Sequence, residues 1–193
     1  MISEMTKTLN GLDVVQLSQT VDAVKKQPTL ANFQFRAKNR WLSGAENHSV
    51  IKDFYGAGQE DTSRREPFVF VNGEPPLLLG TNQGANPVEF FLHALAGCVT
   101  TTFVLHAAAR GIRIDSISTG LEGEIDVQGV LGLDETVNPG YEQIRIKMDV
   151  KADCSDTELD NLLTFTREHS PVCQSICRPV PVVLERSAVA SAR

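Results

Sequence analysis

The sequence predicts an α+β fold in which antiparallel strands wrap one long, very apolar helix. The first observation is the run from Val88 to Arg110, which contains only one glycine, Gly97, and no proline, and is apolar around nearly its whole circumference. Such a helix is buried on most sides. The second observation is the alternation of apolar and polar residues in segments 112–129 and 141–153, which is typical of paired strands. One small sheet offers too little cover for this helix, so we also predict a tightly interlocked dimer.

The composition is that of a globular protein rather than a disordered chain. Of 193 residues, 41% are hydrophobic and 22% are charged, and the formal net charge of −6 comes without any basic stripe. We therefore expect no nucleic-acid partner. The apolar run is interrupted by two histidines and three consecutive threonines and lacks the flanks of a membrane span, so we expect no membrane partner. The N-terminus has no uninterrupted apolar segment of the signal type, which predicts a cytoplasmic protein with free thiols.

The chain divides into an arm, a body and a tail. Residues 1–30 are predicted to form an N-terminal helical arm, residues 31–186 the folded domain and residues 187–193 a frayed tail. Within the arm, segment 13–26 has apolar residues at three- and four-residue spacing and is closed by Pro28, which predicts an amphipathic helix. We expect the arm to pack on the body or on a partner subunit.

The body begins with β structure. Alternation of apolar and polar residues predicts strands at 33–41 and 49–56 around a turn. A polar loop at 57–67 and a further strand at 68–71 precede the long helix.

Helix signals mark the second half of the chain. Pro87 suits the first turn of the long helix, and Gly111 suits its C-terminal cap. Ser155 with Glu158 forms the capping-box pattern that begins a second helix. A short helix or turn and a last strand complete the expected elements, over 171–179 and 180–185.

Four cysteines are the candidate reactive groups: Cys98, Cys154, Cys173 and Cys177. None forms a C-x-x-C pair, and Cys173 and Cys177 have the spacing of one helical face. With only His169 nearby a zinc site has little support, so we expect no metal and no other cofactor. The sequence contains no G-x-S-x-G, Walker or G-x-G-x-x-G motif, and serine hydrolysis and nucleotide binding are not predicted.

Cys98, near the centre of the apolar helix, has two interpretations. Free cysteine is often buried as a small hydrophobe. As a nucleophile it would need a nearby cation or hydrogen-bond donors and a path to solvent. His93 and His106 lie about 140° and about 80° away around the helix, so any activating group must come from elsewhere in the fold.

The segment NPVEFFLHALAGCVTTTFVLHAAARGI, followed by a strand pair, a helix and HSPVCQSICRPVPV, resembles the OsmC/Ohr family of thiol peroxidases and their relatives. The resemblance covers about residues 33–184, and its most specific motif is N-P-x-E-x-x-L-x-A-x-x-x-C. It implies antiparallel sheets wrapped around long central helices in an intertwined homodimer with its active sites at the interface. It also implies a thiolate that attacks a hydroperoxide, becomes a sulfenic acid, condenses with a resolving cysteine and is restored by a thiol reductant. The longer N-terminus points to a subgroup.

The resemblance also assigns roles by position. Cys98 takes the peroxidatic place. The catalytic glutamate that directly follows the helix-starting proline in the family comes one residue later here, at Glu89, which turns its side chain by about 100°. The family's resolving cysteine corresponds to Ser170. Cys173, three residues on, is therefore the candidate resolving residue, with Cys177 as the second choice.

The family's catalytic arginine is expected in the first hairpin, where this chain has His48. Arg40, Arg64 or Arg65 could substitute, and the sequence does not select among them. The predicted substrate pocket consists of His48, Phe90, Phe91 and Ser170.

Three functional hypotheses follow. The first is a thiol peroxidase for organic hydroperoxides, with Cys98 attacking, Cys173 resolving and Glu89 assisting. The second is a binding protein that holds a hydrophobic small molecule at the dimer interface, beside aromatic residues such as Phe90, Phe91 and Phe103, without turnover. The third is a one-cysteine enzyme or sensor in which an external thiol resolves Cys98. The expected partners are a second copy of the chain, an organic hydroperoxide or other apolar small molecule, and a thiol reductant.

Overall fold

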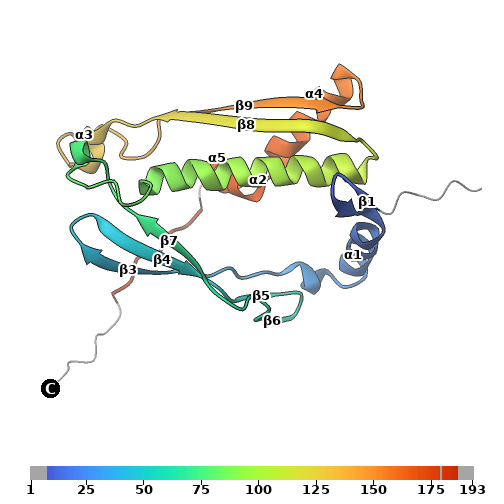
Figure 1. The fold of residues 1–193 in the computed structure, drawn as a ribbon, viewed down its shortest axis with the longest axis horizontal. Coiled ribbons are helices and arrows are strands. Elements are labelled where there is room, and N and C mark those ends of the chain that lie inside the picture. Colours follow the sequence, from blue (N-terminus) through green and yellow to red (C-terminus); the bar gives the residue numbers. More distant parts are fainter. Residues whose placement is uncertain (1–7, 179, 187–193) are drawn as a thin grey trace, which may run out of the picture.

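The computed structural model describes residues 8–178 and 180–186, which form an open arch (Figure 1). One side of the arch is helix α2 (Pro87–Ala109) beneath a two-stranded sheet. The other side is a three-stranded sheet, whose strand β7 (Phe68–Asn72) leads toward the start of α2. Helix α1 (Val14–Lys26) closes the opposite end of the arch. The fold class is α+β with antiparallel sheets, as predicted.

The arm is a small hairpin followed by a helix. Its further elements are β1 (Thr8–Leu9), β2 (Leu12–Asp13) and the short 3-10 helix η1 (Pro28–Ala31). Asp13 caps α1 by accepting hydrogen bonds from two backbone N–H groups of the first turn, which confirms the predicted helix. The Asn10 side chain ties the arm to the body, because it donates to the Ile112 carbonyl and accepts from the Ile114 amide, both at 2.9 Å. Residues 1–7 of the predicted arm and the predicted frayed tail, 187–193, lie outside the described residues.

The three-stranded sheet has the order β3–β4–β7, with β3 at Lys38–Ser43 and β4 at Glu46–Ile51. The first strand begins later than the predicted start at residue 33, because the preceding segment crosses the arch and pairs only through an isolated bridge from Gln34 to Tyr55.

The polar loop predicted at 57–67 is wrong in its first part, which belongs to a tight hairpin. Strands β5 (Phe54–Gly56) and β6 (Gln59–Asp61) pair across a two-residue turn. Ala57 and Gly58 both adopt left-handed conformations there, with φ of 50° and 86°. This pair of conformations matches the twist of a two-residue hairpin. The sequence did not predict the turn, because its first position is not one of the residues, Asn, Asp or Gly, that usually mark it.

Helix α2 begins and ends as predicted. The Asn86 side chain accepts a hydrogen bond from the Val88 amide at 2.7 Å, Pro87 follows in the first turn, and Gly111 beyond the C-terminus has φ of 75°. By length and composition α2 could cross a membrane, a test that the core helix of a soluble protein also passes. Only 22% of its most apolar 18-residue window is buried within one chain.

The two-stranded sheet consists of β8 (Ile114–Glu124) and β9 (Gln143–Ala152), a long antiparallel hairpin as predicted. Alternate residues of β9, among them Ile146 and Met148, pack on the helices, while their neighbours in sequence face solvent. The wide connection between the strands contains one helical turn, α3 (Val127–Val130).

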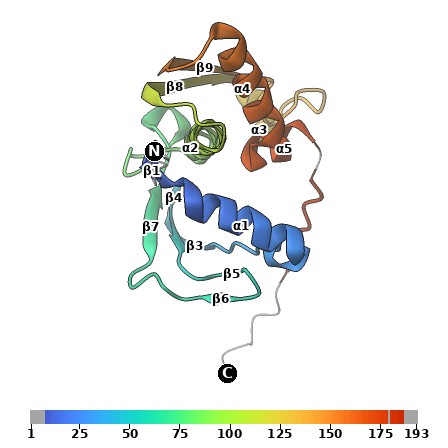
Figure 2. The ribbon, with the colours of Figure 1, turned by 90° about the vertical axis from the view of Figure 1, so that its right-hand side faces the viewer.

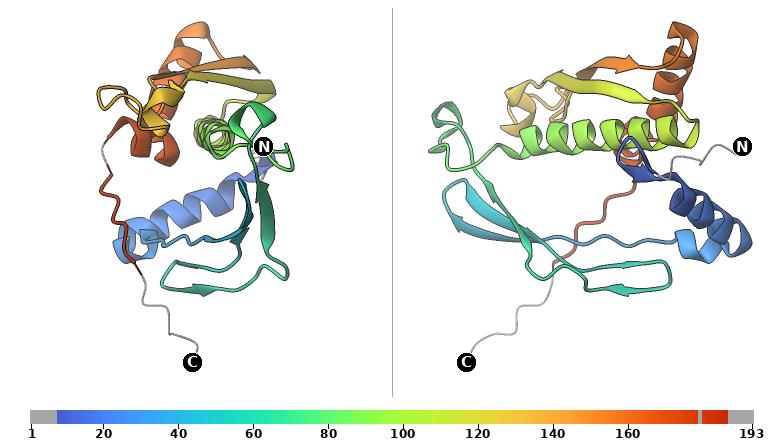
Figure 3. Two further views of the ribbon diagram at one scale, coloured as in Figure 1. Left: turned by 90° about the vertical axis from the view of Figure 1, so that its left-hand side faces the viewer. Right: turned by 45° about the vertical axis from the view of Figure 1, so that its right-hand side comes forward.

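Helices α4 (Asp156–His169) and α5 (Pro171–Cys177) follow the hairpin and lie along one side of α2 (Figure 2). The predicted capping box is confirmed: the Ser155 amide donates to the Glu158 carboxylate at 2.9 Å, and the Glu158 amide donates to the Ser155 hydroxyl at 3.3 Å. The strand predicted at 180–185 is wrong. A strand needs a neighbouring strand for its backbone hydrogen bonds. This segment instead extends from α5 across the arch without strand pairing, with Leu184 98% exposed (Figure 3).

The core lies between α2, the β8–β9 sheet and the two C-terminal helices. Two clusters of buried residues form it, the first of Phe103, Ala107, Ile112 and Leu162 and the second of Leu95, Val99 and Cys173. On the opposite side of the arch large apolar side chains remain exposed, including Phe35, Trp41 and Phe68. In one chain the core therefore lies on the α2 side of the arch, and the three-stranded sheet leaves apolar side chains exposed.

Candidate functional site

The Cys98 sulfur accepts two hydrogen bonds at the start of α5. The Ser170 hydroxyl donates to Cys98 Sγ at 3.2 Å, and the Val172 backbone N–H donates to the same sulfur at 3.4 Å. Cys98 itself is half-buried. The structure thus places the mid-helix cysteine of α2 against the first turn of a helix that is more than seventy residues away in the sequence.

Ser170 is fixed by its position between two helices. It is the C-cap of α4 and the N-cap of α5, and its amide donates to the Thr166 carbonyl at 2.9 Å. Its carbonyl accepts the Gln174 amide at 2.9 Å, and Pro171 sets the first turn of α5. Because Ser170 is 0% exposed, its hydroxyl has a defined direction and meets the sulfur of Cys98 rather than water.

Both contacts place a hydrogen-bond donor at the Cys98 sulfur. A thiolate accepts hydrogen bonds more strongly than a neutral thiol, and bonds to ionised groups are shorter and stronger than neutral ones. The two groups are a buried serine hydroxyl and a backbone amide. A nucleophilic Cys98 was expected to need donors from outside α2, and these two groups are donors of that kind.

Cys173 and Cys177 lie on consecutive turns of α5. Cys173 is buried, at 7% exposed, and packs against Leu95 and Val99, whereas Cys177 is exposed. Their sulfurs are 4.0 Å apart. Burial raises the pKa of the Cys173 thiol above its ordinary value, the charge and hydrogen bond of Cys177 raise it further, and the Arg167 guanidinium opposes the shift. Cys154 lies in the other core cluster, and burial and then the nearby carboxylate of Glu158 raise the pKa of its thiol.

A pocket of about 260 Å³ adjoins Cys173 on the inner side of the sheet. Its lining is mainly apolar and comes from α2, β9, α4 and α5: Val99, Ile146, Met148, Leu163, Thr166, Arg167 and Cys173. The Thr166 hydroxyl is buried and has no hydrogen-bond partner among the described residues. Arg167 adds the one cationic side chain of this lining.

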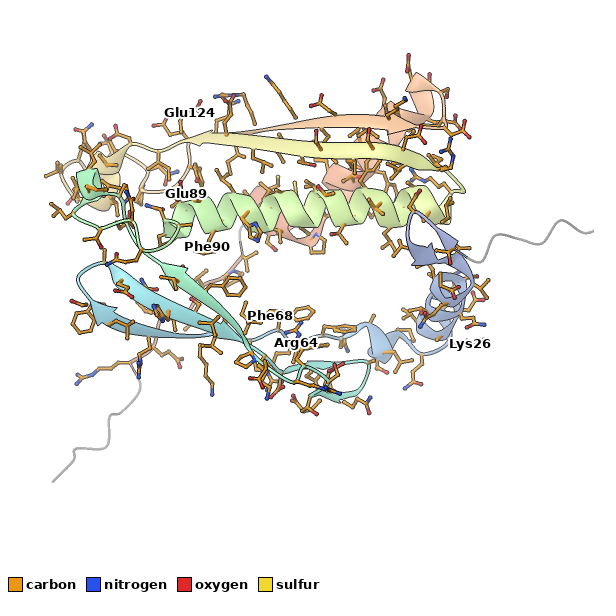
Figure 4. All side chains as sticks on the ribbon, in the orientation of Figure 1. Lys26, Arg64, Phe68, Glu89, Phe90 and Glu124 are labelled. Atoms are coloured by element: carbon orange, nitrogen blue, oxygen red, sulfur yellow. The ribbon has the colours of Figure 1, made fainter. Side chains whose placement is uncertain are left out.

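Glu89 lies at the start of α2 (Figure 4), where it acts as a capping residue. Its carboxylate accepts the Asn86 amide at 2.8 Å, and the Asn86 side chain in turn accepts from the first turn. Nine residues of helix separate Glu89 from Cys98, which is about 13 Å along the axis. The structure therefore does not bring these two predicted site residues together within one chain, and a catalytic role of Glu89 remains a prediction.

The residues of the predicted substrate pocket lie in different places. Ser170 touches Cys98. The ring of Phe90 packs edge-on against Phe70 at 6.0 Å, whereas Phe91 packs on Tyr141 at 5.8 Å, so the two neighbours point to different sides of α2. His48 lies in the β3–β4 hairpin across the arch and contacts Glu46 at 3.0 Å. Of the predicted pocket residues, only Ser170 contacts the Cys98 sulfur within one chain.

The candidate arginines differ in their positions and side-chain contacts. Arg40 is the cross-strand neighbour of His48 in the first hairpin, where the resemblance places the catalytic arginine. Arg64 donates to the Lys52 carbonyl at 2.6 Å and lies over the rings of Phe54 and Phe68, each 5.3 Å away. These contacts give Arg64 a structural role, and a catalytic role of Arg40 or Arg65 remains a prediction.

Sequence reasoning missed three groups of the site. The Val172 amide is a backbone donor, and no residue type could have revealed it. Thr166 and Arg167 line the pocket because α4 turns them toward Cys173, and their positions shortly before Ser170 in a helix were the only available signal. In the described part of the chain, no group of three or more His, Cys, Asp or Glu side chains is arranged to hold a metal ion.

A sequence model of the OsmC-like proteins matches residues 80–185, more than half of the chain. The chain belongs to the OsmC-like protein family. The matched region contains α2 with Cys98, the β8–β9 hairpin and both C-terminal helices. The membrane-length helix α2 is thus part of the region that matches the family.

Solved OsmC-like structures share this fold at low sequence identity. The OsmC-like protein from Mycoplasma pneumoniae is 15% identical, with a TM-score of 0.58 over 75% of this chain and 87% of that chain. An OsmC-like protein of unknown function from Vibrio cholerae is 12% identical, with a TM-score of 0.52 over 74% of this chain and 92% of that chain. A comparison with curated proteins finds no match to this sequence.

Proposed function

We propose that this OsmC-like protein is a cytoplasmic, thiol-dependent peroxidase that reduces organic hydroperoxides through Cys98. The observation that carries the proposal is the pair of hydrogen bonds from the Ser170 hydroxyl and the Val172 amide to Cys98 Sγ. A buried structural cysteine needs no such donors, whereas a nucleophilic thiolate does. Membership of a family that includes hydroperoxide-reducing enzymes supports the same reaction.

The reaction begins with the Cys98 thiolate attacking the outer oxygen of the hydroperoxide. The O–O bond breaks, the sulfur becomes a sulfenic acid, and the alkoxide leaves as an alcohol after taking a proton from solvent. The apolar surface of α2 around Cys98 suits an organic peroxide better than hydrogen peroxide.

The sulfenic acid is then resolved by a thiol. Cys173, on the helix whose first turn contacts Cys98, condenses with it to a disulfide and releases water, or an external thiol takes this role. The distance condition is strict, because a disulfide requires Cα atoms within about 7 Å. An external reductant finally returns both cysteines to thiols.

The proposal includes a homodimer that covers the apolar surface of the open arch. In one chain most of the apolar α2 surface is exposed, as are Phe35 and Trp41 on the opposite sheet. Contiguous exposed apolar surface of this kind is rare in monomers. We expect sedimentation to give twice the chain mass at micromolar concentration. A stable monomer would contradict the dimer.

The test of function is consumption of cumene hydroperoxide in the presence of a small dithiol. We expect the parent protein and the Cys154→Ser control to consume the peroxide and Cys98→Ser to be inactive. Equal rates for Cys98→Ser and the parent would reject the reaction. An inert Cys98 together with a co-purified apolar molecule in native mass spectrometry would favour the binding protein instead.

A further inference from the structure

We propose that Cys177 is a third redox-active cysteine, which takes the oxidised state from Cys173 and passes it to an external dithiol at the surface. This inference rests on the proposed function, since it adds the last step to the reaction of Cys98. Cys98, Cys173 and Cys177 then form a relay that leads from the half-buried attack site to solvent.

The first observation is the distance between the two sulfurs of α5. Cys173 Sγ and Cys177 Sγ are 4.0 Å apart and contact each other directly. Residues four apart in an α-helix have Cα atoms about 6 Å apart, which is within the usual range for a disulfide. The Cβ atoms of such residues are about 5–6 Å apart, whereas a disulfide spans about 4 Å between Cβ atoms, so the last turn of α5 must shift its backbone to close the remaining gap.

The second observation is the position of Cys177 at the end of its helix. Cys177 is the last residue of α5, and the next residue, Arg178, is already extended, with φ of −122° and ψ of 129°. One backbone bond, from the Arg178 amide to the Gln174 carbonyl, holds the cap. The turn that must adjust is therefore the least constrained turn of the helix.

The third observation is that Cys177 is more exposed to solvent than Cys173. Cys173 is 7% exposed, so a reductant protein cannot reach its sulfur without opening the core, whereas Cys177 is exposed. Thiol–disulfide exchange requires an in-line approach to a sulfur, and the accessible sulfur is the one that reacts. In a disulfide between Cys98 and Cys173 one partner is buried and the other is half-buried, whereas a disulfide between Cys173 and Cys177 includes an exposed residue.

The fourth observation is the free space beside Cys173. The pocket of about 260 Å³ lined by Cys173 and Val99 gives the Cys173 side chain room to turn between its two partners. A sulfur in a closely packed core lacks this freedom. Arg167 lines the same pocket and opposes the burial that raises the pKa of Cys173, so its charge favours the thiolate form there.

The relay step balances as a thiol–disulfide exchange. The Cys177 thiolate attacks the Cys173 sulfur of the Cys98–Cys173 disulfide, a new S–S bond forms, and Cys98 leaves as a thiolate. The proton lost by Cys177 is taken up by solvent, and no electron is gained or lost within the protein. An external dithiol then attacks Cys177, reduces the Cys173–Cys177 disulfide and is itself oxidised to a disulfide.

One arm of the test concerns the cysteine pair alone. Cys98→Ser and the parent protein are equilibrated in mixtures of oxidised and reduced dithiothreitol, alkylated and mapped by mass spectrometry. We expect a Cys173–Cys177 disulfide in both proteins under oxidising mixtures. If no such disulfide forms in either protein under the most oxidising mixture, the relay is rejected, whatever Cys98 does with peroxides.

The other arm concerns turnover. We expect Cys177→Ser to keep the first stoichiometric oxidation of Cys98 by cumene hydroperoxide but to lose turnover with a reduced thioredoxin as probe by about tenfold or more, while Cys154→Ser retains turnover. Turnover of Cys177→Ser at the parent rate would overturn the relay. A failure of the proposed function is distinguishable from both outcomes, because Cys98 would then remain unoxidised in the first turnover of the parent.

Discussion

The hydroxyl of Ser170 donates a hydrogen bond to the sulfur of Cys98 at 3.2 Å, although the two residues belong to different helices and the hydroxyl is buried. Ser170 also stands where the family resemblance places a resolving cysteine. One residue therefore marks both the likeness of this site to its relatives and its difference from them. In this chain the position supplies a hydrogen-bond donor, and the candidate resolving thiols lie further along α5.

Removing the Ser170 hydroxyl should slow the reaction of Cys98. A hydrogen bond to an ionised group contributes about 1.5–3 kcal/mol, so Ser170→Ala should lower the rate constant of Cys98 with cumene hydroperoxide by about tenfold or more. Ser175→Ala is the matched control, because the Ser175 hydroxyl donates to the Pro171 carbonyl in the same helix and is exposed. Stopped-flow measurement of both variants checks this, and equal rates for the two would remove Ser170 from the site.

Replacing Ser170 by cysteine should create a disulfide. The side-chain atom of residue 170 already lies within hydrogen-bond distance of Cys98 Sγ, so Ser170→Cys should bridge to Cys98 on mild oxidation. Ser175→Cys, on the exposed side of α5, should not. Mapping of disulfides by non-reducing mass spectrometry distinguishes them, and an unbridged thiol at position 170 after oxidation would contradict the geometry.

The buried hydroxyl of Thr166 is expected to lower the free energy of unfolding. Its hydroxyl is buried and unpartnered among the described residues, and Thr166 is 2% exposed. Replacement of an unsatisfied buried hydroxyl by a methyl group of the same shape is neutral or stabilising, so Thr166→Val should raise the free energy of unfolding by about 1 kcal/mol. Thr164→Val, at an exposed position of the same helix, is the control in urea denaturation. A loss of about 1 kcal/mol on Thr166→Val would show that the hydroxyl has a partner.

Much of the fold could be predicted from residue patterns, because the signals were local. Pro87, Gly111 and the Ser155–Glu158 pair set helix ends through their own backbone preferences, and the structure confirms each of them. The segment 180–185 has the composition of a strand, yet within one chain it has no neighbouring strand to pair with. Composition indicates the capacity to form a strand, and tertiary structure decides whether a partner exists.

The site was less predictable, because its contacts join distant segments. Cys98 and Ser170 were both candidates, but nothing in their spacing indicated that the serine donates to the cysteine. The second donor is a backbone amide, at Val172, which carries no residue signature. Glu89 was predicted to be a catalytic glutamate displaced by one residue, and the structure shows that it caps α2.

Glu89 should contribute to the stability of α2. Loss of its capping bond in Glu89→Ala should lower the free energy of unfolding by about 1 kcal/mol, whereas Glu89→Gln keeps an acceptor oxygen and should restore most of it. Urea denaturation of both variants checks this. A Glu89→Gln protein with parent stability but a slower reaction of Cys98 would assign the carboxylate to the chemistry as well.

His106 should make stability depend on pH. Burial lowers the pKa of His106, and the charges of Arg110 and His169 lower it further. The unfolded chain therefore binds the proton more readily, so stability should fall as pH decreases from about 7 to about 5. His106→Gln should flatten this part of the profile of unfolding free energy against pH. The opposite result would be a parent protein that becomes more stable as pH decreases in this range, with the gain lost in His106→Gln. That result would contradict a lowered pKa of His106.

The most direct test of the central claim is to identify which cysteine reacts first. The reduced protein is treated with one equivalent of cumene hydroperoxide, quenched within the first turnover and probed with a sulfenic-acid trap, and all four cysteine peptides are quantified by mass spectrometry. We expect the sulfenic acid, or the disulfide that follows from it, on Cys98. Oxidation that begins on Cys173, Cys177 or Cys154 while Cys98 remains a free thiol would contradict it.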